Sequence, residues 1–192
     1  SYVGSILSAS ALGVAAFNGD MKAMSLPLIL AAMGVICSII GTFLVRTKEG
    51  ASQKDLLRAL SKGTNFSAIV IAIISFPLVY FILGKENWTL YFPILAGLLA
   101  GVLIGQATEY FTSDTYKPTK KLSDSSETGS ATIIISGLSL GMISTALPIV
   151  IVAICVLVSY FISGGGSQGL YGIALAAVGM LSTLGITLAT DA

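Results

Sequence analysis

The stretch ATIIISGLSLGMISTALPIVIVAICVLVSYFI, residues 131–162, decides the fold class of this chain. It has no charged side chain, and about 20 apolar residues are enough to cross the hydrocarbon core of a bilayer. The uncharged run extends from 128 to 190, which is too long for one helix, and the polar, glycine-rich segment 163–169 interrupts it. This run therefore predicts two membrane helices.

The composition of the whole chain agrees with a membrane protein. Apolar residues make up 55% and charged residues 10%, against roughly 45–50% and about 25% in soluble domains, and the mean hydropathy is +0.93. The net charge of +1 excludes a broad basic surface for nucleic acid. Because the chain has no histidine, imidazole bases and most zinc sites are excluded, and any chemistry has to use carboxylates.

Uncharged stretches between turn signals predict an all-α, polytopic transmembrane helix bundle in which 1–192 is one membrane fragment. Six spanning helices are expected, the first of them truncated, at about 1–17, 27–46, 67–84, 90–112, 131–162 and 169–190. The chain begins without Met or a basic leader and ends directly after an acidic residue and an alanine. We therefore expect it to be a piece of a longer protein.

The connectors between these spans differ in charge. Those at 18–26, 85–89 and 163–168 hold only Lys22 and Lys85 as basic residues. The other basic residues lie at or within the loops 47–66 and 113–130: Arg46, Lys48, Lys54, Arg58, Lys62, Lys117, Lys120 and Lys121. Loops rich in Lys and Arg stay on the cytoplasmic side, so we expect these two loops to be cytoplasmic.

Glycines recur at four-residue spacing on two of the expected helices. Gly97, Gly101 and Gly105 lie along one face of 90–112, and Gly137 and Gly141 repeat the spacing on 131–162. Small residues on one face allow another helix to approach closely in a membrane. We interpret these glycines as packing positions.

Two acidic residues stand apart from those in the loops. Glu109 and Asp191 each end a long apolar helix at the expected cytoplasmic side. The helix dipole disfavours an acid there, so it needs a cation or a base nearby. For Asp191, the residues alone leave ion binding and simple solvation as equal alternatives.

A family resemblance begins at Gly105-Gln106-Ala107-Thr108-Glu109-Tyr110-Phe111-Thr112-Ser113 and continues in order. The further motifs are Tyr116-Lys117-Pro118, Thr128-Gly129-Ser130-Ala131-Thr132, Ile135-Ser136-Gly137-Leu138 with Gly141, and Ser144-Thr145-Ala146-Leu147-Pro148. With these motifs, and with Ser1-Tyr2 and Ala189-Thr190-Asp191-Ala192 at its two ends, the chain resembles the integral membrane pyrophosphatases, which pump sodium ions or protons using pyrophosphate.

The resemblance implies a fold and a reaction. The chain would hold the sixth to eleventh of roughly sixteen helices in a multi-pass protein of the prokaryotic plasma (inner) membrane. The family hydrolyses pyrophosphate at the cytoplasmic face with Mg²⁺, so Asp191 is expected to bind the Mg²⁺–pyrophosphate complex. Most of that site would lie outside this chain, which alone should be inactive. A homodimer, contacts with membrane lipid and the remaining helices, and K⁺ as a candidate activator are also implied.

The same resemblance bears on the pumped ion. In proton-pumping members a gate glutamate stands at the position of Gly4, whereas in sodium-pumping members it stands immediately before the Ser1-Tyr2 pair. Since Gly4 has no side chain, we expect a sodium pump with Ser1 as a candidate Na⁺ ligand. A proton-pumping pyrophosphatase is the alternative. Two interpretations come from another class of protein. A secondary transporter would leave the ordered motifs unexplained, and a structural membrane subunit without hydrolysis would leave Asp191 without a role.

Overall fold

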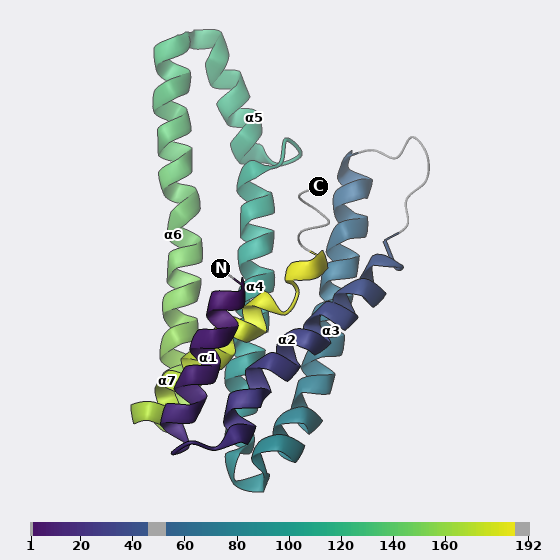
Figure 1. Ribbon diagram of the computed structural model, residues 1–192. Coiled ribbons are helices and arrows are strands. Elements are labelled where there is room, and N and C mark those ends of the chain that lie inside the picture. The colour runs from purple at the N-terminus through teal and green to yellow at the C-terminus, as the bar shows by residue number, and fades with distance from the viewer. Residues whose placement is uncertain (1, 46–52, 187–192) are drawn as a thin grey trace. The chain divides into compact units, whose positions relative to one another are not determined.

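A computed structural model describes residues 2–45 and 53–186, with the backbone alone at 53 and 54 (Figure 1). Helices joined by turns make up this part of the chain, which confirms the all-α class. The chain divides into two compact units. The first comprises 1–102 with 155–192, and the second comprises 103–154.

The first unit contains most of the helices. They are α1 (Tyr2–Ala16), α2 (Met21–Thr42), α3 (Gln53–Leu83), the 3-10 helix η1 (Lys85–Leu90), the first part of α4 (Tyr91–Thr112), the last turns of α6 (Ser130–Ile162) and α7 (Gly166–Leu181). Among the described residues, five helical segments are long and apolar enough to cross a membrane, and α1 is a shorter apolar helix. These segments are Met21–Thr42, Asp55–Leu83, Lys85–Thr128, Ser130–Ile162 and Gly166–Ile186.

The core of the first unit forms around α7, which lies against α1 and α2 (Figure 1). Tyr171 and Leu175 of α7 are fully buried there, as is Leu26 of α2. The backbones of α4 and α7 also meet, because a Cβ atom added at Gly179 would lie 2.7 Å from the carbonyl oxygen of Ile94. Such close approach increases the van der Waals attraction between the helices. This attraction drives helix association in a bilayer, where the hydrophobic effect does not favour contact between helices over contact with lipid.

Local chemistry explains where two of these helices begin. The Oδ1 atom of Asp20 accepts a hydrogen bond of 2.9 Å from the Lys22 amide and caps α2. Before α7, the three consecutive glycines 164–166 have φ values of 93°, 72° and 57°. Residues other than glycine rarely adopt positive φ values. The uncharged run 128–190 can therefore reverse direction between α6 and α7.

The two expected loops contain helices. α3 begins at Gln53, so the loop placed at 47–66 is wrong from that residue onward. Residues 55–60 are mostly good helix formers, and Asp55 in the first turn complements the helix dipole. The segment 113–130 contains α5 (Lys117–Asp124), with a proline in its first turn, and the 3-10 helix η2 (Ser125–Thr128).

Two further helices differ from the expected spans. α2 starts at Met21 rather than 27, which places Pro27 inside the helix. α7 is interrupted after Leu181, the backbone is helical again at 184–186, and the expected end at 190 lies outside the described residues. The Ser182 hydroxyl donates a hydrogen bond of 2.5 Å to the Gly179 carbonyl. Serine side chains that bond the preceding turn in this way compete with the helix ladder.

In the second unit, α4 continues from 103 to 112 and is followed by α5, η2 and residues 130–154 of α6. No residue of 130–154 is buried within the chain. A Cβ added at Gly141 or Gly105 would meet no atom within 4 Å, and one at Gly137 would meet only Leu122. Among the described residues, the close packing expected for these glycines is seen at Gly97 and Gly101, on the first part of α4.

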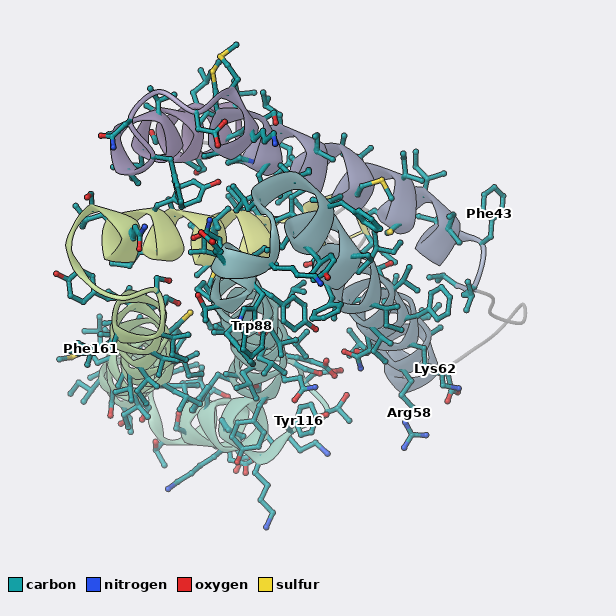
Figure 2. The ribbon with its side chains drawn as sticks, turned by 90° about the horizontal axis from the view of Figure 1, so that it is seen from below. Phe43, Arg58, Lys62, Trp88, Tyr116 and Phe161 are labelled. Carbon is teal, nitrogen blue, oxygen red and sulfur yellow. The ribbon has the colours of Figure 1, made fainter. Side chains whose placement is uncertain are left out.

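Aromatic side chains project from the helices of the first unit. Phe43 after α2 and Phe161 near the end of α6 are 73% and 72% exposed, and both point away from the ribbon (Figure 2). Exposed aromatic rings on apolar helices suit contact with acyl chains or with further apolar helices.

Candidate functional site

The two residues predicted to act in the pump, Ser1 and Asp191, both lie outside the described residues. The structure describes the helices that lead to them. α1 begins at Tyr2, directly after Ser1, and the described chain beyond α7 ends at Ile186, five positions before Asp191. The contacts that hold α1 and α7 therefore determine how the chain approaches both residues.

One end of α1, the start of α2 and the first turns of α7 meet at Tyr171. Its hydroxyl donates a hydrogen bond of 2.7 Å to the Ala23 carbonyl oxygen of α2. Its ring meets that of Phe17, just after α1, in an edge-to-face contact with 5.7 Å between centroids. A Cβ atom added at Gly13 would lie 2.9 Å from the Tyr171 ring, so α1 also approaches it closely. Tyr171 thus contacts both α1 and α2.

Farther along, small residues bring α2 and the last described part of the chain together. A Cβ added at Gly34 would lie 2.6 Å from the Ser182 carbonyl oxygen, and one at Gly185 would lie 2.8 Å from the Cβ of Ser38. Ile186, the last described residue, is fully buried. The path of the chain toward Asp191 is consequently fixed by packing up to five residues before it.

The other end of α1 is less tightly enclosed. The Tyr2 hydroxyl donates to the Ala31 carbonyl of α2 over 3.4 Å. Gly4 is exposed, and a Cβ atom added there would meet nothing within 4 Å. Contacts within the described part of the chain therefore do not require a glycine at this position.

In the second unit, Glu109 lies near the end of α4. The Tyr116 hydroxyl donates to its Oε1 atom over 3.5 Å, and the Tyr116 ring lies 5.4 Å from that of Tyr110. The Thr119 hydroxyl also donates a hydrogen bond to the Phe111 carbonyl oxygen. The acid at this helix terminus thus receives a hydrogen bond from the segment that follows.

Within 2–45 and 53–186, no three Asp, Glu, His or Cys side chains gather closely enough to hold a metal ion. Cys37 and Cys155 are both free and buried, as small apolar residues. A carboxylate such as that of Asp191 suits Mg²⁺, which takes few protein oxygens together with substrate phosphates.

Sequence reasoning missed the contribution of Tyr171. It stands 148 positions from Ala23, and neither residue belongs to a motif. One signal was present, because a tyrosine inside an uncharged helix needs a partner for its hydroxyl when it is buried.

A family model described as inorganic H⁺ pyrophosphatase matches residues 1–192. A protein of Bacteroides thetaiotaomicron, named as a K⁺-stimulated pyrophosphate-energized sodium pump, is 50% identical over all of the chain, and a Clostridium tetani protein of the same name is 47% identical over all of it. A Methanosarcina mazei protein, named as a K⁺-insensitive pyrophosphate-energized proton pump, is 40% identical over 99%.

The chain spans 28% of the length of each of these three relatives. Its residues match the family model from the first to the last, and the described part contains five helical segments long and apolar enough to cross a bilayer. This chain belongs to the inorganic H⁺ pyrophosphatase family of membrane proteins.

Proposed function

We propose that the whole protein couples pyrophosphate hydrolysis at the cytoplasmic face to outward pumping of Na⁺ across the prokaryotic plasma membrane. The observation that carries this proposal is the 50% identity, along the entire chain, with a relative named as a sodium pump. The relative named as a proton pump is 40% identical over nearly the same residues. We also propose that K⁺ stimulates the pump, because the two relatives with 50% and 47% sequence identity are named as K⁺-stimulated.

The surroundings of Gly4 support Na⁺ as the pumped ion. A glycine has no carboxylate to serve as a proton gate, and contacts within the chain give no packing reason for a glycine there. We propose the Ser1 hydroxyl as a Na⁺ ligand, since hard cations prefer oxygen ligands. An acidic partner would have to come from outside this chain.

Asp191 is proposed to bind the Mg²⁺–pyrophosphate complex. The packing of Ile186 brings the chain to a defined position shortly before this residue, and a rigid support is what a metal-binding carboxylate requires. Bound Mg²⁺ would neutralise charge on the phosphoryl oxygens during hydrolysis. The other ligands are proposed to come from the remainder of the protein.

The charge of the α3 terminus supports the proposed orientation. Arg58 and Lys62 lie one turn apart near the start of α3 and are both exposed, and Figure 2 shows their side chains beside each other at that end of the helix. Lys and Arg near a membrane helix favour the cytoplasmic side. The same side would receive pyrophosphate.

The test uses the full-length protein reconstituted in vesicles. We expect pyrophosphate with Mg²⁺ to drive uptake of radiolabelled Na⁺ that persists when a protonophore is added, and K⁺ to accelerate it. Hydrolysis without any ion uptake would contradict the pumping proposal.

A proton pump is the second candidate, and the 40% identity with the Methanosarcina mazei relative favours it. It predicts acidification of the vesicle interior without Na⁺ uptake. The same vesicles, loaded with a pH-sensitive dye, distinguish the two candidates.

A further inference from the structure

We propose that Tyr171 is a positioning residue of the pump, because its hydroxyl replaces a backbone donor that Pro27 removes from α2 and so fixes α7 along its axis. This inference rests on the proposed function, since α7 leads to Asp191.

The first step concerns the carbonyl of Ala23. In an α-helix this group accepts from the amide four residues later, which here belongs to Pro27 and has no hydrogen. Ala23 is 0% exposed, so bulk water does not replace the missing donor. The Tyr171 hydroxyl lies 2.7 Å away and donates to this oxygen. A buried polar group without a partner is costly, and this hydrogen bond satisfies both groups.

The second step concerns how little freedom the ring has. A Cβ atom added at Gly13 would lie 2.6 Å from the Ala23 oxygen and 2.9 Å from the Tyr171 ring. The edge of the ring also meets Phe17. The hydroxyl therefore reaches Ala23 from a position enclosed on the side of α1 and on the side of α2.

The third step separates this contact from the rest of the packing of α7. The approaches at Gly179, Gly34 and Gly185 are contacts between small groups, and each such van der Waals contact contributes little energy by itself. A hydrogen bond weakens steeply when its angle or length changes. Sliding α7 by one residue shifts it by about 1.5 Å and turns it by about 100°. The Tyr171–Ala23 bond opposes that movement, and Asp191 lies farther along the same segment.

The experiment uses three variants of the full-length protein: Tyr171→Phe, Pro27→Ala, and the two combined. Tyr171→Phe leaves the Ala23 oxygen without a donor and also releases α7, so we expect a lower unfolding temperature together with a higher KM for Mg²⁺–pyrophosphate. Pro27→Ala restores the helical donor. Because a carbonyl oxygen accepts two hydrogen bonds, this single variant should resemble the wild type in both measurements.

The combined variant separates positioning from stability. Its Ala23 oxygen has a helical donor again, so the unfolding temperature should return toward that of the wild type. The bond between α2 and α7 is still absent, so KM should stay raised by roughly 3- to 10-fold, the factor that corresponds to one hydrogen bond. Tyr160→Phe is the matched control, because its hydroxyl accepts from the Gly166 amide at an exposed turn, where water can replace it.

Each outcome decides a separate point. A wild-type KM in the combined variant would overturn the positioning role, and an unfolding temperature that Pro27→Ala does not restore would overturn the role of the Ala23 carbonyl. If Tyr171→Phe alone does not fold, folding of the combined variant supports the carbonyl assignment, and its KM still tests the positioning. A wild-type protein that does not hydrolyse pyrophosphate would contradict the proposed function instead.

Discussion

Gly97 and Gly105 lie two helical turns apart on one face of α4 but have different surroundings. A Cβ atom at Gly97 would collide with the backbone of Ala176, whereas one at Gly105 would meet nothing within 4 Å. Overpacking of this kind costs about 1–3 kcal/mol. We therefore expect Gly97→Ala to lower the unfolding temperature of the detergent-solubilised full-length protein and Gly105→Ala to leave it unchanged. Equal effects would show that the rest of the protein covers both positions.

Asp191 provides a second test at a single residue. If its carboxylate binds Mg²⁺–pyrophosphate, Asp191→Ala should reduce hydrolysis by the full-length protein on the order of 100-fold or more, because it removes a ligand of the Mg²⁺ that would stabilise charge in the transition state. Asp124→Ala is the control, since Asp124 is an exposed residue at the end of α5. Phosphate release at ordinary Mg²⁺ is the measurement. Turnover near that of the wild type would remove Asp191 from the site.

Single contacts were the least predictable feature of the site. The Tyr171–Ala23 hydrogen bond joins residues 148 positions apart, and hydropathy contains no information about such pairs. Pro27 offered a partial signal. It leaves one carbonyl without a helical donor, but the sequence does not say which side chain supplies the replacement.

At the scale of elements, the extent of the uncharged runs determined what could be predicted. α6 (Ser130–Ile162) begins one residue before its expected start and ends where expected, because Gly129 and the turn at 163–166 bound it. The beginning of α3 was missed because its first turns are polar, and hydropathy marks only the apolar part of a helix. The break after Leu181 was not predicted, because Ser182 interrupts the helix without changing the apolar character of the stretch.

The expected membrane orientation can be tested on two connectors. We expect Glu86→Cys in the full-length protein to react with an impermeant thiol reagent added outside intact cells, and Ser126→Cys to resist it, because basic residues favour the cytoplasmic side. Both positions are exposed. The native Cys37 and Cys155 are buried and should contribute little background. Labelling of Ser126→Cys alone would invert the orientation.

For the whole molecule, the family resemblance leads us to expect a homodimer. None of the first 25 residues of α6 is fully buried within this chain, so other parts of the protein, lipid or a second copy must cover their exposed apolar side chains. Native mass spectrometry of the full-length protein in detergent should give twice the mass of one chain. A monomer that retains full pyrophosphate hydrolysis would contradict this expectation.

The length of α6 has a consequence for the bilayer around it. Its 33 residues span about 50 Å at about 1.5 Å per residue, whereas the hydrocarbon layer is roughly 30 Å thick. The helix carries no charge over its whole length, and most of its serine and threonine residues lie in its first half. Tilting of the helix or thickening of the surrounding lipid would accommodate part of this difference, at a cost that grows with the mismatch, and the rest of the helix would extend beyond the hydrocarbon layer. The tilt of α6 from the bilayer normal should therefore change with the acyl-chain length of the surrounding lipid.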